Sequence, residues 1–436
     1  MFDFSLTDLL VAFGNDPFTG MWLLFRSGGW VIFVWIFLWM AEHLWLEHVQ
    51  EKAAHKKEFI VLRATAPRMS EQTPKAAENI FTALAAAGSG ASWTGKWIRG
   101  AHQSPVSMEI VSLEGEVSFY LRIEKRLRDL AEAAIFAQYP DTDIDIVEDY
   151  AKLVPVDYPD AAYDLWGTEL TVTKSDAYPL KTYEDFTDQV SGEMKDPIAV
   201  MLENLSRLGP GEQFWYQIVM MPTDQKAARE RASAEVGKIR GEVKAHAPTL
   251  VDTILHLPID IIQEILSIFL PRSEKKHDDK KKDGPPKMQL LSPGERLVLE
   301  AIERKTSKIG FMCKIRVVYV AKKEKLQPSK VVTPFMGAVR QLNTFHMQSL
   351  VPNSKSIGMN GDLWWFKTER NNARKNRIIR AYRDRSAGVG LPMFFLSSEE
   401  LATLWHFPIL AQVKAPLLRK TQAKKSEPPS NIPFGE

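Results

Sequence analysis

The segment VSMEIVSLEGEVSFYLRI, Val106 to Ile123, decides the fold because its pattern is that of a β-hairpin. Apolar and polar residues alternate in Val106–Leu113 and again in Val117–Ile123, which is the period of two that a half-buried strand requires. The short loop Glu114–Glu116 separates the two runs and has a glycine at its centre, as tight antiparallel turns do. The segment therefore predicts two adjacent, antiparallel strands.

Helical and extended patterns alternate on both sides of this hairpin. A strand is predicted at Phe59–Thr65 and a helix at Pro74–Ala87, and after the hairpin a helix at Lys125–Gln138 and a strand at Asp143–Glu148. The order β-α-β-β-α-β over residues 58–150 is that of a ferredoxin-like unit. Such a unit is a structural platform and does not by itself define a function.

The rest of the chain predicts a second ferredoxin-like unit over residues 165–407, so the expected fold class is α+β. Its strands are predicted at Thr168–Lys174, Phe214–Met221, Gly310–Ala321 and Gly390–Leu396, with helices at Pro197–Leu208 and Ser329–Asn343. A long insertion, about 222–306, contains a linker at 272–287 that is too polar to fold alone. The capping box Ser397-x-x-Glu400 predicts a closing helix, and the proline-rich tail 408–436 is expected to be extended.

The insertion also contains an apolar helix, predicted at 249–270, with one narrow polar stripe. The stripe consists of Asp252, His256, Asp260, Glu264 and Ser267. Packing in the core, packing against a partner subunit and contact with a membrane all fit this pattern. The acidic stripe favours core or partner packing, because helices that lie on membranes usually carry Lys and Arg.

The N-terminal region predicts a membrane anchor at residues 1–50. Gly28–Ala41 is 14 residues long, has no charge and is rich in Trp, Phe, Ile and Val. Met21–Phe25 and Leu44–Leu46 extend it toward the roughly 20 residues of a spanning helix. More Lys and Arg follow the segment than precede it, so the positive-inside rule places the rest of the chain in the cytoplasm.

Composition adds a charge asymmetry to this organisation. The chain has 436 residues, 45% of them apolar, which fits a globular protein of two or three domains. The net charge of +2 says little about partners, but residues 141–196 hold 15 acidic residues against 4 Lys, a balance of −11. Residues 355–425 hold 14 Lys and Arg against 5 acidic residues, a balance of +9. The single cysteine, Cys313, excludes an intrachain disulfide.

Three fragments resemble known sites, and each lacks an essential residue. Gly90-x-x-x-x-Gly95-Lys96 begins a P-loop, but Trp97 stands where a Mg²⁺-binding Ser or Thr belongs. The segment that starts at Asp141 has Ile146 and Lys152 in place of the Gly and Glu of a calcium loop. The sequence His43 to His55 contains no His-Glu-x-x-His. We therefore expect no metal, no cofactor and no enzymatic activity.

The strongest charged feature is the predicted helix Glu369–Arg385. Its candidate phosphate contacts are Arg370, Arg374, Lys375, Arg377, Arg380 and Arg383. Such a helix fits nucleic-acid or anionic-lipid binding, with DNA as a candidate partner. A solvated helix, or a partner for the acidic stretch of the same chain, is the alternative. Phe119 and Tyr120 would point to opposite faces of their strand, which matches RNA-binding ferredoxin-like domains poorly.

Several stretches resemble one family of proteins. They are PKAAENIFTAL, VSMEIVSLEGEVSFYLRI, AAIFAQYPDTDIDIVEDY, LSPGERLVLEAIERKTSKIGF, and FFLSSEELATLWHFP followed by KKSEPPSNIPFGE. Together, from about Phe59 to Glu436, they resemble the region that precedes the motor in large membrane-anchored bacterial ATPases. Those ATPases are similar to the coupling proteins of type IV secretion and conjugation. In the longer relatives an ATPase domain with a true P-loop follows a segment like SEPPSNIP, and the present sequence contains no Gly-x-x-x-x-Gly-Lys-Ser/Thr.

The resemblance implies a non-catalytic platform or adaptor of a type IV secretion-like or conjugative ATPase system. A motor ATPase domain or subunit would be its partner, and a homo-oligomer is a further candidate. The expected location is the bacterial inner membrane, with a single pass and the bulk of the chain in the cytoplasm. The alternative is a nucleic-acid or anionic-lipid binding module that uses the basic helix 370–385.

Overall fold

The computed structural model describes most of the chain. The residues described are 22, 25, 30–54, 56–67, 72–88, 93–98, 100–101, 103–188, 190–240, 291–353, 366–409 and 418. They fall into two compact units. The first comprises residues 1–59 and 89–104, and the second comprises residues 60–88 and 105–436.

The first unit contains the helices α3 (Trp30–Ala54) and α5 (Trp93–Trp97). The indole Nε1 of Trp45 donates a hydrogen bond of 3.1 Å to the carbonyl oxygen of Trp97 and so links the two helices. Gly100 has a φ of +64° and lies against the backbone of Val49, where a Cβ would overlap the Val49 carbonyl. Glycine is therefore required at this close approach.

The predicted membrane anchor is wrong. Across the described ranges, no helix is both long enough and apolar enough to span a membrane. Most of residues 1–29 lie outside those ranges, and α3 is apolar only in its first half. Charged and polar groups begin at Glu42 and recur through Lys52, so the uncharged run stays short of the roughly 20 residues required. The expected single-pass location in the inner membrane is wrong for the same reason.

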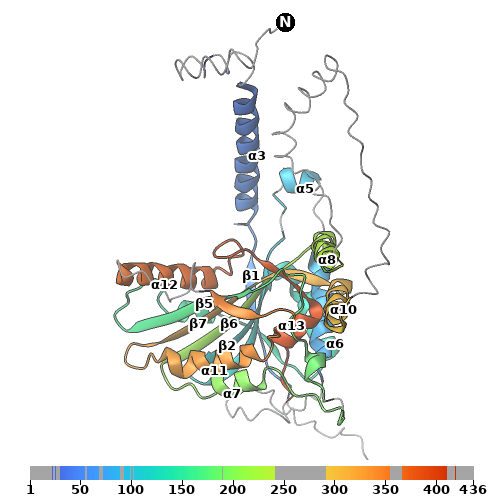
Figure 1. The fold of residues 1–436 in the computed structure, drawn as a ribbon. Coiled ribbons are helices and arrows are strands. Elements are labelled where there is room, and N and C mark those ends of the chain that lie inside the picture. The colour runs from blue at the N-terminus through green and yellow to red at the C-terminus, as the bar shows by residue number, and fades with distance from the viewer. Residues whose placement is uncertain are drawn as a thin grey trace, which may run out of the picture. The chain divides into compact units, whose positions relative to one another are not determined.

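The second unit is built on one sheet, in which the described residues form nine strands (Figure 1). These are β1 (Phe59–Ala64), β2 (Val106–Leu113), β3 (Glu116–Glu124), β4 (Ile144–Val147), β5 (Tyr163–Val172), β6 (Glu212–Pro222), β7 (Gly310–Lys322), β8 (Leu350–Asn353) and β9 (Phe394–Ser397). The strand order is β4-β1-β3-β2-β6-β7-β5-β8, and β9 pairs with β7. The protein is thus of the α+β class.

The hairpin predicted at Val106–Ile123 is confirmed by the antiparallel pairing of β2 and β3. Its turn is tighter than expected, because Glu116 already pairs with Leu113. Glu114 and Gly115 remain as the two central residues, with φ of +55° and +95°. Positive φ at both positions is the geometry that matches the twist of a two-residue hairpin.

The two halves of the sheet meet where β2 pairs with β6, in the register Val106↔Met220 to Leu113↔Gln213. The predicted fold, a transmembrane helix followed by two ferredoxin-like units, is therefore wrong. The strands assigned to separate units share one continuous sheet, and β9 lies beside the start of β7. A period of two assigns side chains to faces, but it does not say which strand edges will pair.

Helices cover both faces of this sheet. They are α4 (Lys75–Leu84), α6 (Arg128–Gln138), α7 (Ala199–Leu205), α8 (Gln225–Ile239), α10 (Pro293–Ser307), α11 (Pro328–Arg340), α12 (Lys367–Arg383) and α13 (Ser398–Leu404), with 3-10 turns at Ala85–Ala87, Lys125–Leu127, Tyr150–Leu153 and Tyr183–Phe186. Ile110 of β2 faces the larger core, to which α4, α6, α7, α11 and α13 contribute. The next residue, Val111, faces a second core, and α12 packs there. Successive residues of a strand point to opposite faces, so one strand serves both cores.

Two predicted segments are described only in part. The apolar helix at 249–270 and the linker at 272–287 lie outside the described residues, between α8 and α10. Of the tail, Pro408, Ile409 and Leu418 are described. Leu418 is 5% exposed and forms a parallel bridge with Val117 at the start of β3.

Candidate functional site

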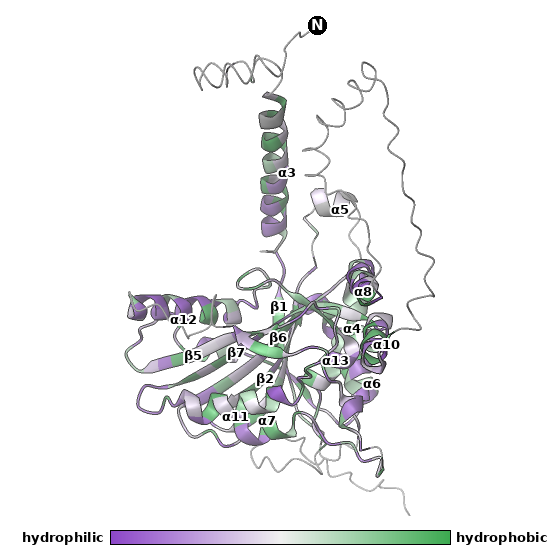
Figure 2. Ribbon diagram, viewed as in Figure 1, coloured by the Kyte–Doolittle hydropathy of each residue, from purple (hydrophilic) through white to green (hydrophobic). Residues whose placement is uncertain are grey.

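The basic helix predicted at 369–385 is α12, and its apolar residues fix its orientation. Ile378, Ile379, Ala381 and Tyr382 are buried against the sheet. Residues at i, i+1, i+3 and i+4 share one side of a helix, so Arg377 and Arg380 turn away from the sheet and are exposed. Figure 2 shows α12 as a mostly hydrophilic helix lying on the sheet.

Acidic residues of the segment 149–164 pair with cations of α12 and the turn after it. Lys375 forms an ion pair with Asp164, and Arg380 forms one with Asp157. Between them, Asn376 accepts a hydrogen bond from Tyr158 N at 2.5 Å and donates one to Tyr158 O at 3.0 Å. The structure therefore brings this part of the basic helix together with the acidic stretch of the same chain.

The most buried of these ion pairs involves Arg385, just after the end of α12. Arg385 Nε donates to Glu109 Oε1 at 2.9 Å, and Arg385 Nη2 donates to Glu109 Oε2 at 3.1 Å. Arg385 also pairs with Asp149. Burial alone would raise the pKa of the Glu109 carboxyl, but the charge and hydrogen bonds of Arg385 outweigh it and hold that pKa below its ordinary value.

Further buried hydroxyl and amide groups complete this network. Glu109 accepts hydrogen bonds from Ser107 Oγ at 2.6 Å, Tyr150 OH at 2.6 Å and Gln217 Nε2 at 2.9 Å. The hydroxyls of Tyr150 and Tyr382 lie 2.7 Å apart, and burial raises the pKa of both well above the ordinary value. Every partner is supplied by the chain itself, so the network joins β2, β6 and α12 structurally.

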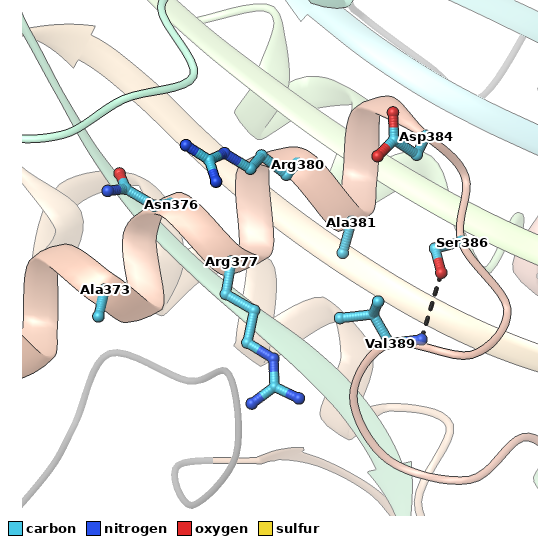
Figure 3. A pocket seen from close by; sticks show the side chains of 8 residues that line it. All are labelled: Ala373, Asn376, Arg377, Arg380, Ala381, Asp384, Ser386 and Val389. Atoms are coloured by element: carbon cyan, nitrogen blue, oxygen red, sulfur yellow. Dashed lines mark hydrogen bonds between the residues drawn. The ribbon is translucent and has the colours of Figure 1, made fainter.

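Of the six predicted contacts, Arg377 and Arg380 are exposed. Within the described ranges Arg377 forms no ion pair. Its side chain enters a groove of about 580 Å³ between α12 and the loop after it (Figure 3). The groove is lined by Ala373, Asn376, Arg377, Arg380, Ala381, Asp384, Ser386 and Val389. Arg370, Arg374 and Arg383 are half-buried along the same helix.

The loop that forms the second wall of the groove is held by buried groups of the sheet. Lys314 Nζ donates to the carbonyl oxygens of Ala387 and Val389, each at 2.7 Å. Arg316 Nη2 donates to those of Ser386 and Val389 at 2.7 and 2.8 Å. Burial lowers the pKa of Lys314 to about 8. The wall is thereby fixed before any ligand binds.

Sequence reasoning missed Glu109 and the two cations of β7. Glu109 occupies a polar position of an alternating strand, which predicts a solvent-facing side chain, yet it is fully buried beneath α12. Lys314 and Arg316 alternate in the same way and are also buried. The signal in the sequence was a charged residue between apolar neighbours in β2, and two charged residues at alternate positions in β7.

The remaining fragments considered from the sequence are structural or lie partly outside the described residues. Gly95 belongs to α5, and residues 89–92 are not among those described. Cys313 is buried in β7, and burial raises the pKa of its thiol. Across the described ranges, no group of three or more His, Cys, Asp or Glu side chains is arranged to hold a metal ion.

These features define an α+β protein with a basic helix on its sheet, and acidic residues of the same chain form ion pairs with that helix. Residues 43–415 match the family model described as Domain of unknown function (DUF8128). The match covers most of the chain, so the protein belongs to this family. No curated protein matches the chain.

Proposed function

We propose that the chain is a non-catalytic platform that holds a motor ATPase domain or subunit of a type IV secretion-like or conjugative system. The resemblance of its segments to the region preceding such motors motivates the proposal. The observation that supports it is the firm attachment of residues 394–409, the last continuous described segment, which ends just inside the tail. A motor attached beyond the tail would exert its load at this point.

The segment first contributes β9 to the sheet, where Phe394 to Ser397 pair with Cys313 to Gly310 of β7. Ser397 then caps α13, accepting a hydrogen bond from Glu400 N while its own N–H donates to the Glu400 carboxylate at 2.8 Å. All residues of α13 are buried. A helix buried on every side belongs to the core and does not fray as a terminal helix does.

Aromatic packing continues this attachment beyond α13. The ring of Phe119 on β3 meets those of Trp405 and Phe407 edge to face, with centroids 5.6 and 5.0 Å apart. Tyr139, after α6, meets Phe407 in the same way at 4.9 Å. Edge-to-face pairs of this kind add to the stabilisation that comes from buried area.

Asp196 holds the start of the tail and the residues just before it. Its carboxylate accepts a hydrogen bond from Ile409 N at 2.9 Å and lies 3.2 Å from His406 Nε2. The other ring nitrogen, His406 Nδ1, lies 2.7 Å from the carbonyl oxygen of Ala402. Leu418 returns to the sheet beside Val117. Load on the tail would thus be transmitted to the sheet, as a platform for a motor requires.

Lysine-directed crosslinking in the source cell, followed by mass spectrometry, tests the proposal. The tail provides the reactive residues Lys414, Lys420, Lys424 and Lys425. We expect crosslinks from these lysines to a sequence that contains a complete P-loop, either later in the same polypeptide or in a separate subunit. The intact mass of the native polypeptide distinguishes these two arrangements.

Lys226 and Lys238 of α8 serve as the internal comparison, because they are remote in sequence from the tail. If the tail lysines link only to this chain, or only to proteins without a nucleotide-binding motif, the proposal is wrong. Equal linking of α8 and the tail to every partner would indicate non-specific capture, which also removes the support for a dedicated platform.

A further inference from the structure

We propose that the outer face of α12, centred on Arg377 and Arg380, binds the phosphate backbone of a nucleic acid without reading its sequence. We further infer that Asp157 competes with this ligand for Arg380. The proposal does not depend on the platform function, because it concerns a surface on a different element from the tail.

The composition of this face favours nucleic acid over a lipid surface. A helix that binds at a membrane surface presents apolar side chains to the acyl chains beside its cations. In α12 the large apolar residues Ile378, Ile379 and Tyr382 are fully buried in the protein. The outer face of α12 therefore offers charge while these large apolar side chains are buried, which suits a phosphate backbone bound by electrostatics alone.

The groove gives Arg377 room to receive a phosphate. Ala373, one turn before Arg377, is exposed, and Ala381, one turn after it, lies at the edge of the buried side and still lines the groove, so small side chains flank Arg377 (Figure 3). The planar fork of an arginine donates two parallel hydrogen bonds to a phosphate. Across the groove, the Ser386 hydroxyl accepts a hydrogen bond from Val389 N at 3.2 Å and keeps its own proton for a further acceptor.

The groove is also rigid on both sides. Lys314 and Arg316 hold the backbone of the loop 386–389, and Asn376 ties α12 to the backbone of Tyr158. Ligand binding to such a preformed wall requires little ordering of the protein, which favours affinity.

Arg380 is occupied in the free protein, but only by a weak partner. The side chains of Arg380 and Asp157 are 58% and 73% exposed, and exposed pairs of this kind contribute little to stability. A phosphate can therefore displace Asp157. Lys375 and Asp164 are more buried, at 15% and 28%, and remain paired. Asp384 also lines the groove and opposes anions, so binding is expected to be weak and salt-sensitive.

The test is fluorescence anisotropy of the full chain with a short labelled single-stranded oligonucleotide. If Arg377 and Arg380 each contact one phosphate, affinity falls roughly sevenfold between about 50 and about 200 mM salt. In Arg377→Gln the same change in salt lowers affinity only roughly threefold, because one contact is lost. In Asp157→Asn the affinity at low salt rises by up to about fivefold, because Arg380 is released.

The exposed pair Glu203 and Arg207 on α7 provides matched controls for charge. Arg207→Gln and Glu203→Gln change the net charge by the same amounts at a distant helix, and neither is expected to alter binding by more than about twofold. Circular dichroism checks that each variant is folded.

Three outcomes would overturn nucleic-acid binding by this face, and a fourth would overturn the competition for Arg380. Wild-type protein that binds the oligonucleotide no better than Arg377→Gln removes the site. Equal effects of Arg377→Gln and Arg207→Gln would mean that only net charge acts. Retention by anionic vesicles without oligonucleotide binding would assign the face to lipid instead. Equal affinities of wild type and Asp157→Asn would overturn the competition for Arg380.

Discussion

Glu109 and Arg385 lie 276 positions apart in the sequence and form a two-pronged ion pair in which both side chains are fully buried. Glu109 lies on β2, next to the junction with β6, and Arg385 follows α12. Arg385 has a φ of +51°, a left-handed conformation that is uncommon for a residue other than glycine. The pair therefore holds a strained turn and connects α12 to the centre of the sheet.

We expect Glu109→Gln to lower the free energy of unfolding by about 3–5 kcal/mol. The substitution keeps the shape of the side chain but leaves the Arg385 charge without its main partner in a buried place, which is the costly way to break such a pair. Chemical denaturation followed by tryptophan fluorescence measures the effect, since Trp215 lies 5.3 Å from the ring of Tyr150 in the same core.

Glu132→Gln is the control for this prediction. Glu132 pairs with Arg128 one turn earlier on α6, and the arginine is 45% exposed. Exposed pairs of this kind are worth about 0–1 kcal/mol. A loss in Glu109→Gln no larger than that in Glu132→Gln would contradict the structural role assigned to the buried pair.

Stability should also fall with acid, because the pKa values of Glu109, Asp149 and Asp196 are all lowered in the folded protein. For each, burial acts to raise the pKa. For Glu109 and Asp149 the charge and hydrogen bonds of Arg385 lower it further than burial raises it, and for Asp196 the interaction with the His406 ring and the hydrogen bonds from the backbone do so. A carboxyl whose folded pKa lies below its unfolded pKa binds fewer protons in the folded state near that range. Its stabilising contribution is therefore complete above the unfolded pKa and is lost as pH falls through the folded pKa.

Unfolding free energies measured from pH 7 downward should decline from about pH 5. In Glu109→Gln one of the three carboxyls is missing, so the decline should be shallower than in the wild type. Parallel curves for the two proteins would show that Glu109 does not contribute to the acid sensitivity.

Two glycines of the second unit should respond to alanine in opposite directions. Gly390 has a φ of +100°, and a Cβ there would overlap the carboxylate of Glu169, which pairs with Arg316. Gly390→Ala should cost about 2 kcal/mol or more through backbone strain and displacement of that buried pair. Gly337 lies inside α11, where a Cβ would meet nothing within 4 Å.

Gly337→Ala should raise the free energy of unfolding by about 0.5–1 kcal/mol, because alanine loses less backbone entropy than glycine in a helix. Thermal and denaturant unfolding of both variants measure the difference. Destabilisation by Gly337→Ala would contradict the description of helix α11. Full stability of Gly390→Ala would contradict the description of the loop backbone at Gly390.

The sequence predicted the local elements of this fold better than their assembly. The hairpin of β2 and β3 and the capping box at Ser397 were readable because each depends on neighbouring residues. The pairing of β2 with β6 was not, since alternation does not specify an edge partner. The anchor was mistaken because an uncharged run of 14 residues was extended with flanking segments, although charge resumes at Glu42.

The candidate site, too, could be predicted from the sequence only in its local features. A cationic helix was evident from composition, but which of its cations are paired depends on contacts with residues more than 200 positions away. Lys375 and Arg380 are paired with Asp164 and Asp157, and Arg377 is exposed. The sequence left both interpretations open because charge balance is a property of a segment, whereas pairing is a property of individual side chains.

Two capping boxes of the second unit, those at α10 and α13, differ in burial, and this difference predicts how they respond to substitution. At α13 both Ser397 and Glu400 are buried, whereas at α10 Ser292 and Glu295 are exposed. Ser292→Ala should cost about 1 kcal/mol, because water replaces the lost partner of the backbone N–H. Ser397→Ala should cost about 2 kcal/mol or more, since the N–H of Glu400 is left buried without its acceptor. Denaturant unfolding of the two variants gives both values, and equal losses would mean that water reaches the start of α13.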